Sequence, residues 1–196
     1  FTVAAKETRA DLKWLPPVAT VTGARIAELI FLQGKDVFEL QPGLWVVDIA
    51  TDLVFADATA ERPVKNEPSR RLFALHEVLR EIGFIDYCRA RQPDEWIFPA
   101  AFYYGKESVK DPAGAASKRH NNRLAKLGIH KPHETTFHST RHTAKDIMRI
   151  AKVDARTADR QTGHAVKNVA DSYGSKKLRV DEVEVLAALP LPEGLD

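Results

Sequence analysis

Four side chains that suit phosphoryl transfer lie between positions 138 and 173 of this chain. His138 and Arg141 are three residues apart, so a helix that starts here places both on one face. His164 and Tyr173 follow, nine residues apart. A guanidinium binds two phosphate oxygens through its planar fork, and a phenol can attack phosphorus and form a covalent intermediate. The stretch therefore predicts phosphoryl transfer without a metal.

An amphipathic helix after His138 would hold these groups on a packed support. Apolar residues recur at i, i+3, i+4 and i+7, which predicts a buried stripe. The stripe consists of Ala144, Ile147, Met148 and Ala151. Lys145, Arg149 and Lys152 fall outside it and are expected to face solvent or an anionic partner.

This stretch resembles the tyrosine recombinase family, the phage-type integrases. The family signature is His-x-x-Arg-His-Thr, then Gly-His, then a Tyr nine residues after that His, and all three parts are present here at that spacing. Residues 22–29 are similar to a further box of the family, Thr-Gly-x-Arg-x-x-Glu-Leu. The resemblance implies that Arg25 is the first phosphate clamp and that Glu28 supports the site.

A third region, residues 64–76, is similar to the family's hairpin, Lys-x-x-x-Ser-Arg-Arg-x-x-Pro-Leu-His. The resemblance implies that Lys65 protonates the leaving 5′ oxygen. Ala74 stands where that pattern has Pro. A second departure precedes Gly-His, where the family usually has leucines and this chain has Arg160, Gln161 and Thr162. The packing of that helix therefore stays open.

The resemblance implies a complete set of site residues. The catalytic residues would be Arg25, Lys65, His138, Arg141, His164 and Tyr173. Glu28 and His142 would support them. No cofactor and no metal are implied, because fixed cations replace the usual Mg²⁺. His138 and His142 have a zinc-compatible i, i+4 spacing, but the Glu of a His-Glu-x-x-His motif and a nearby thiolate are both missing, so we expect no metal site.

Each box has an ordinary interpretation when it is taken alone. Arg25 and Glu28 could form a common surface pair at i, i+3. Lys65 could be a surface lysine beside a turn, and Tyr173 a buried aromatic with a satisfied hydroxyl. Because the boxes occur once each and in the family's order, we favour the site over these alternatives.

The charge distribution is uneven although the net charge is only +2. Residues 118–152 carry nine Lys and Arg against two acids, and residues 181–196 carry five acids and no base. A basic middle of this kind indicates a face that binds a polyanion, although solvation of helix faces is an equally good explanation of the charge alone. The residues expected to bind DNA are Arg70, Arg71, Lys118, Arg119, Arg123, Lys126 and Lys145.

Composition limits the remaining classes. The chain has 196 residues, 44% of them hydrophobic, which is ample for one core. Its single cysteine, Cys88, cannot form an internal disulfide and is expected to be a core residue in a reducing compartment. No apolar run approaches the roughly 20 residues of a membrane span, and no signal peptide is recognised at the start. These features favour a cytoplasmic protein with no membrane partner, and the resemblance implies that it is bacterial or phage-encoded and associated with the nucleoid.

The pattern predicts a mainly α fold with a small antiparallel sheet, an α+β class that matches the catalytic domain of tyrosine recombinases. Helices are expected from Trp14 to Gly23, with Pro16 and Pro17 in the first turn, and over 24–33, 117–127 and 153–162. Strands are expected over 44–50, 62–65 and 70–75, the last two joined as a hairpin. Residues 105–116 are expected to form a loop.

We expect residues 1–13 to be a polar lead-in from an N-terminal DNA-binding domain that is missing here. Residues 14–174 would form the catalytic domain, and 175–196 a tail that docks in cis or on a neighbouring protomer. The implied function is site-specific DNA recombination through a 3′-phosphotyrosine. The partners would be double-stranded attachment sites and, on DNA, three further copies in a homotetramer, with a monomer or weak oligomer in its absence. Alternatives are relaxation like that of a type IB topoisomerase, an inactive DNA-binding derivative, or a basic helical interaction domain.

Overall fold

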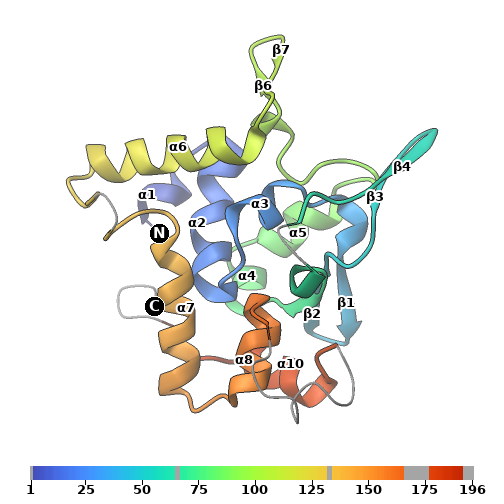
Figure 1. The fold of residues 1–196 in the computed structure, drawn as a ribbon, viewed down its shortest axis with the longest axis vertical. Helices are drawn as coiled ribbons and strands as arrows, with labels where there is room; N and C mark the ends of the chain where they lie inside the picture. Colours follow the sequence, from blue (N-terminus) through green and yellow to red (C-terminus); the bar gives the residue numbers. More distant parts are fainter. Residues whose placement is uncertain (1, 65–66, 132–133, 166–176, 192–196) are drawn as a thin grey trace.

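The computed structural model describes residues 2–64, 67–131, 134–165 and 177–191. Helices surround a central three-stranded sheet, and two short hairpins project from the body (Figure 1). The expected α+β class, mainly helical with a small antiparallel sheet, is confirmed. In the described part of the chain, no helix is both long and apolar enough to cross a membrane.

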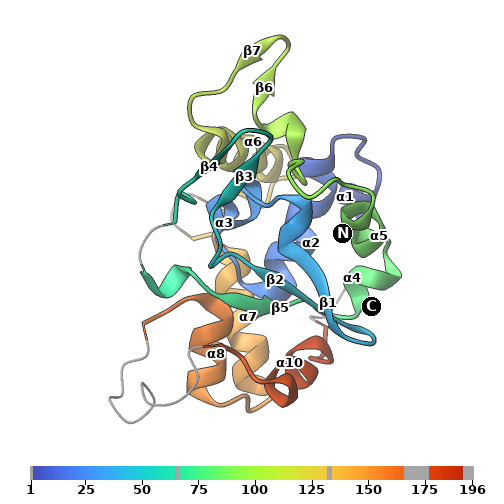
Figure 2. The same cartoon turned by 90° about the vertical axis from the view of Figure 1, so that its right-hand side faces the viewer.

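The central sheet has the order β1-β2-β5 and is antiparallel throughout. The strands are β1 (Val37–Gln41), β2 (Leu44–Asp48) and β5 (Leu72–Ala74). Successive side chains of a strand point to opposite faces, so Val47 and Phe73 enter one hydrophobic cluster while Val46 and Ala74 enter another. The sheet is therefore buried on both faces, as its place between the helices in Figure 2 shows.

The expected hairpin between 62–65 and 70–75 is wrong for the described residues. β5 pairs with β2 instead, and Glu67–Ser69 forms a 3₁₀ turn before it. Arg62 explains the difference, because its buried guanidinium bonds to Asp36 and to the carbonyl oxygens of Phe31 and Thr51. These bonds hold the segment against the core and away from strand pairing. β1 was not expected from the sequence.

Helices lie on both sides of this sheet. Their bounds are α1 (Thr2–Ala5), α2 (Ala10–Thr22), α3 (Ile26–Ile30), α4 (Val78–Glu81), α5 (Phe84–Arg89), α6 (Pro112–Lys126), α7 (Ser139–Ile150), α8 (Ala155–Thr162) and α10 (Val180–Ala187). Short 3₁₀ segments occur at η1 (Gly34–Asp36) and η3 (Pro99–Ala101). α2 packs on α7, and α3 on α6. Ala144 and Met148 of the expected α7 stripe are buried, whereas Ala151 is exposed.

The start of α2 differs from expectation. The helix begins at Ala10, so residues 10–13 belong to it, and Pro16 and Pro17 lie inside it. Pro16 has no N–H for the carbonyl of Leu12, and Arg123 of α6 donates to that oxygen at 3.2 Å. The side chain of α6 thus compensates for the proline, which a reading of the helix alone could not predict. Gly23 ends α2 with φ of +67°, as expected.

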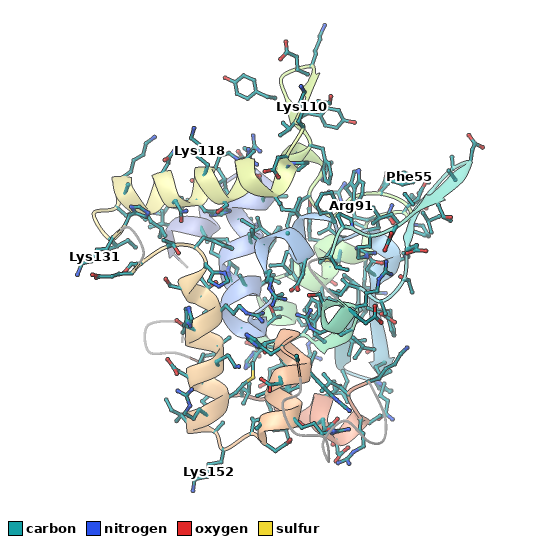
Figure 3. The ribbon with its side chains drawn as sticks, viewed as in Figure 1. Phe55, Arg91, Lys110, Lys118, Lys131 and Lys152 are labelled. Carbon is teal, nitrogen blue, oxygen red and sulfur yellow. The ribbon has the colours of Figure 1, made fainter. Side chains whose placement is uncertain are left out.

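Two hairpins project from the body, β3 (Leu53–Phe55) with β4 (Ala58–Ala60) and β6 (Tyr103–Tyr104) with β7 (Glu107–Ser108). Phe55 is the last residue of β3, next to the turn of the first hairpin, and Lys110 follows the second (Figure 3). The loop expected over 105–116 is therefore only partly correct. α6 begins at Pro112, because Asp111 caps it through the N–H of Gly114 at 2.9 Å.

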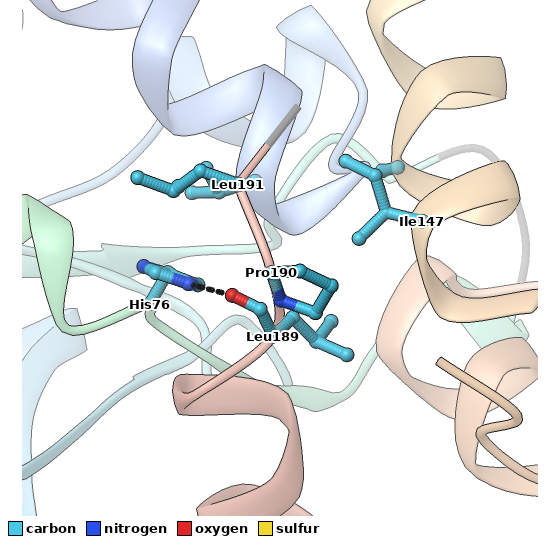
Figure 4. A pocket seen from close by; sticks show the side chains of 7 residues that line it. His76, Ile147, Leu189, Pro190 and Leu191 are labelled. Atoms are coloured by element: carbon cyan, nitrogen blue, oxygen red, sulfur yellow. Dashed lines mark hydrogen bonds between the residues drawn. The ribbon is translucent and has the colours of Figure 1, made fainter. Parts of the chain in front are cut away.

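The C-terminal segment packs on its own chain. α10 lies against β2 and β5, with Val183 and Leu186 buried. The carbonyl of Leu189 lies 2.6 Å from Nε2 of His76, where Leu189, Pro190 and Leu191 line a small apolar cavity with Ile147 (Figure 4). Residues 178–191 thereby cover the second face of the sheet.

Candidate active site

The junction of α2 and α3 positions the first guanidinium. Gly23 ends α2 in a left-handed conformation, and Arg25 is the residue that precedes the first turn of α3. A Cβ at Gly23 would lie 2.9 Å from Cγ2 of Thr162 and 3.1 Å from Cβ of Ala144. The glycine therefore permits both the turn and the close approach of α7 and α8 to Arg25.

Glu28 is the buried carboxylate of this junction. It accepts hydrogen bonds from the backbone N–H of Arg25 at 2.8 Å and from Nη1 of Arg25 at 2.7 Å. Arg71 donates to both carboxylate oxygens, each at 3.1 Å. Burial by itself raises the pKa of Glu28, but Arg71 and Arg25 outweigh it and hold the pKa below its ordinary value. Glu28 is thus an anion that orients two guanidiniums.

Arg71, for which DNA binding stays a prediction, lies mostly inside the protein. It is only 6% exposed, and its Nε and Nη1 donate to the carbonyl oxygens of Gln161 and Ser69 at 3.0 and 3.1 Å. A Cβ added at Gly163 would lie 2.5 Å from its Nη1. Arg71 therefore joins α3, β5 and the end of α8, and four of its five N–H donors are bonded within the protein. We failed to predict this role because the sequence shows two adjacent arginines that look equally exposed.

Arg141 lies in the first turn of α7 and is 4% exposed. Its Nη1 donates to the carbonyl of Gly23, and its Nη2 lies 3.2 Å from each ring nitrogen of His164. Burial, followed by the charge of Arg25, lowers the pKa of Arg141 to about 10. The guanidinium remains charged at neutral pH, but in surroundings where positive charge is crowded.

His164 follows Gly163, which ends α8 with φ of +68°. Its Nδ1 lies 2.8 Å from Oγ1 of Thr162 and 3.3 Å from Nζ of Lys145. Burial and the charges of Arg141 and Lys145 lower the pKa of His164 to about 4. The imidazole is therefore neutral at neutral pH.

A cleft brings the second imidazole to the same place. Arg25, His138 and Arg141 all line it, together with Ala24, Ile26, Ser117, Phe137 and Thr140. His138 is exposed and directly precedes α7. The ring of His142, one turn further along, lies edge-on with its centroid 5.7 Å from that of His138. Arg25, His138, Arg141 and His164 are thus brought together, while Lys65 and Tyr173 lie outside the described residues.

The residues expected to bind DNA fall into three groups. Lys118 and Lys126 are exposed on α6, and Lys118 points away from the body in Figure 3. Arg119 bonds to Asp11 at 3.0 Å, and Arg123 to Glu7 at 2.9 Å. These two arginines attach α6 to α2 and to the segment before it, and their contact with a DNA backbone stays a prediction.

The other two belong elsewhere. Arg70 bonds to Asp52 at 3.3 Å and to Glu61 at 3.0 Å, both of them exposed acids. Lys145 bonds to Asp159 at 3.2 Å and reaches His164, so it belongs to the site itself.

The polar end of α8 packs in a way that the sequence left open. The side-chain amide of Gln161 accepts from the N–H of Ala74 at 2.9 Å and donates to its carbonyl at 3.0 Å. Arg160 donates to the carbonyl of Lys177 at 3.1 Å. Ala74 and Gln161 both depart from the family pattern, and the two departures meet here. A proline at position 74 would have no N–H to donate to the side-chain oxygen of a glutamine.

The assembled site has a surplus of positive charge. Its cations are Arg25, Arg71, Arg141 and Lys145, and its carboxylates are Glu28 and Asp159. Among the described residues, no group of three or more His, Cys, Asp or Glu could hold a metal ion. Guanidinium donors that converge on a cleft suit an oxyanion with several equivalent oxygens, such as a phosphodiester.

Comparison with known proteins agrees with this chemistry. The sequence model described as "Phage integrase family" matches residues 2–178 of the chain. No curated protein and no solved structure matches the chain significantly.

Proposed function

The chain belongs to the phage integrase family, the tyrosine recombinases, and on that premise we propose that it is a site-specific DNA recombinase that cleaves and rejoins strands through a 3′-phosphotyrosine. One observation carries the proposal. Arg25 and Arg141, 116 positions apart in the chain, line one cleft with His138. Glu28 accepts hydrogen bonds from Arg25 and from Arg71. The guanidinium of Arg25 is therefore oriented before an anion binds.

In the proposed reaction, Arg25 and Arg141 hold the non-bridging oxygens of the scissile phosphate. His138 and His164 donate further hydrogen bonds, and His138 assists removal of the proton from the phenol. The oxygen of Tyr173 forms a bond to phosphorus while the bond from phosphorus to the 5′ oxygen breaks. Lys65 gives a proton to that oxygen. The 5′ hydroxyl of another strand then attacks the phosphotyrosine, the phenol of Tyr173 leaves with a proton, and a DNA phosphodiester is restored, so no ATP is consumed.

The test is covalent trapping. The chain is incubated with EDTA and a pool of nicked duplexes that tile the DNA flanking its own gene. A nick beside the cleavage point lets a short 5′ fragment diffuse away, so the adduct accumulates. We expect a protein–DNA adduct that resists denaturation and is absent with Tyr173→Phe. Specific binding without any adduct would support an inactive DNA-binding protein and contradict our proposal.

The role of Lys65 has its own control. A substrate with sulfur in place of the bridging 5′ oxygen leaves as a thiolate, which needs no proton from the enzyme. Lys65→Ala should therefore cleave the ordinary substrate slowly and the sulfur-bridged substrate at nearly the wild-type rate. Equal defects on both substrates would remove Lys65 from the role of general acid.

Recombination is separated from relaxation by the products. Strand exchange between two labelled duplexes by four copies of the protein gives joined molecules that carry both labels. Relaxation of a supercoiled plasmid at a rate proportional to protein concentration, with no exchange at any trapped site, would instead indicate a topoisomerase.

A further inference from the structure

The neighbours of His164 decide which of its two ring nitrogens carries the proton. The proposed reaction depends on that position. A neutral imidazole carries one N–H, on either Nδ1 or Nε2. Only the form protonated on Nε2 can donate from that nitrogen, which lies 3.2 Å from the guanidinium of Arg141. The groups around Nδ1 decide which form is present.

One cation faces Nδ1 alone. Nζ of Lys145 lies 3.3 Å from Nδ1, whereas Nη2 of Arg141 lies 3.2 Å from both ring nitrogens and so does not distinguish the two forms. An ammonium has donors only, so Nδ1 must offer Lys145 a lone pair. Lys145 is one helical turn beyond Arg141 on α7, and Asp159 of α8 holds its ammonium at 3.2 Å. Lys145 is therefore directed at the ring by two elements.

Thr162 acts in the opposite sense. Its hydroxyl lies 2.8 Å from Nδ1 and 2.7 Å from the carbonyl of Ala158, one turn back in α8. When the hydroxyl donates to that carbonyl, its oxygen can accept a hydrogen bond from Nδ1–H. Thr162 alone would thus favour the form protonated on Nδ1. The charged groups that face His164 are Arg141 and Lys145 from α7, Asp159 from α8 and Arg25 before α3.

We propose that Lys145, held by Asp159, is a positioning residue that keeps the proton of His164 on Nε2. The N–H is then available to the anion that Arg141 binds. That the anion is a scissile phosphate rests on the proposed function, whereas the position of the proton does not. The residues of this device are Arg141, Lys145, Asp159, Thr162 and His164.

Nitrogen NMR tests the proposal in the free protein. The chain has seven histidines, and a His164→Asn variant identifies the signals of His164 after labelling with ¹⁵N-histidine. At pH 7, correlations between ring nitrogens and carbon-bound protons distinguish the two neutral forms. We expect the Nε2–H form in the wild type and in Lys145→Arg, and mainly the Nδ1–H form in Lys145→Met.

Thr162 provides the matched control. In the double variant with Lys145→Met and Thr162→Val, the competing acceptor is gone, so the Nε2–H form should return. Thr162→Val alone should resemble the wild type. If Lys145→Met keeps the Nε2–H form, or if the double variant stays in the Nδ1–H form, the proposal is overturned. Should Lys145→Met fail to fold, Asp159→Asn replaces it, with a partial shift toward Nδ1–H as the expected result and no shift as the contrary one.

Cleavage assays separate this inference from the proposed function. A lost hydrogen bond to a charged group should slow adduct formation in Lys145→Met by roughly tenfold to a hundredfold, and Thr162→Val in the double variant should restore the rate. A proton shift in a protein whose wild type forms no adduct would leave the inference intact and contradict the function. An active wild type with no proton shift in Lys145→Met would do the reverse.

Discussion

Two buried carboxylates, Asp36 and Glu28, begin with the same local geometry. Each accepts a hydrogen bond at 2.8 Å from a backbone N–H three residues earlier, at Gln33 and Arg25 respectively. Each also accepts from the guanidinium of a residue distant in the chain. Arg62 reaches Asp36 at 2.7 and 2.8 Å, and Arg71 reaches Glu28 at 3.1 Å.

The two centres differ in what surrounds these pairs. Arg62 is 2% exposed, and two further N–H groups of its guanidinium donate to the carbonyl oxygens of Phe31 and Thr51. At the other centre, Arg25 reaches the carbonyl of Gly163 only through bonds of 3.4 and 3.5 Å, which are near the limit for a hydrogen bond. The first centre is complete and serves the fold. The second keeps weakly used donors at a cleft, as a site for an incoming anion requires.

The largest effect on stability should come from breaking the Asp36–Arg62 pair. Arg62→Met leaves the buried Asp36 with only Lys35, at 3.1 Å, as a cationic partner and also removes the bonds to Phe31 and Thr51, which we expect to lower the free energy of unfolding by about 3–5 kcal/mol. Urea denaturation measures the change. Replacing both members, with Asp36→Asn added, should recover part of the loss. A cost below about 1 kcal/mol for Arg62→Met would mean that the two centres are not distinct in this way.

At the Glu28 centre, loss of an arginine should affect activity more than stability. Arg25→Met leaves Glu28 paired with Arg71, so we expect stability to change by less than about 1 kcal/mol. Adduct formation should nevertheless fall roughly 10²- to 10³-fold, because a donor to the developing negative charge is lost. The matched control is Arg179→Met, because Arg179 bonds to the exposed acid Asp181 and its loss should alter neither quantity strongly. A strongly destabilised Arg25→Met protein would contradict the contrast.

Added anions should distinguish the centres by a smaller amount. Sulfate at ten times its dissociation constant stabilises a protein with one site by about 1.4 kcal/mol. We expect that increment in the wild type and in a destabilised Arg62→Met protein, but not in Arg25→Met or Arg141→Met. The variants lacking the site also report the general salting effect of sulfate, which is subtracted. Equal stabilisation of all four proteins would place no anion at the cleft.

The smallest effect should be the dependence of stability on pH. The pKa of folded His164, about 4, lies below the ordinary value of 6.5, so the unfolded chain takes up a proton first as pH falls. The contribution of His164 to the free energy of unfolding should therefore decrease between about pH 6.5 and pH 4 and be level below that range. The contribution is modest because 39% of the side chain is exposed. Unfolding at several pH values should show a shallower slope for His164→Asn, and saturating sulfate should also flatten it.

Much of the candidate site could be predicted from the sequence. Arg25, Arg141 and His164 each follow a local signal that positions them, namely Gly23 at the end of α2, the apolar stripe of α7 and Gly163 at the end of α8. The structure brings the three together as the spacing suggested. Their catalytic roles, like those of Lys65 and Tyr173, stay predictions.

The rest depended on contacts between distant segments. Burial of Arg71 follows from the pairing of β5 with β2, whereas the sequence suggested a hairpin with 62–65. Arg62 and Asp36 are 26 residues apart, and neither looks unusual in its local sequence. Pro16 is tolerated inside α2 because Arg123 compensates from another helix. Periodicity and short motifs contain no information about such partners.

The amide of Gln161 has one more consequence. β5 is the last strand of its sheet, and an uncovered last strand offers its backbone groups to strands of other molecules. At Ala74 both backbone groups are already occupied by Gln161. Helix α8, which leads to His164, therefore also hinders a second chain from pairing with β5 at this edge of the sheet. Release of α8 would remove the site and expose an aggregation-prone edge in the same event.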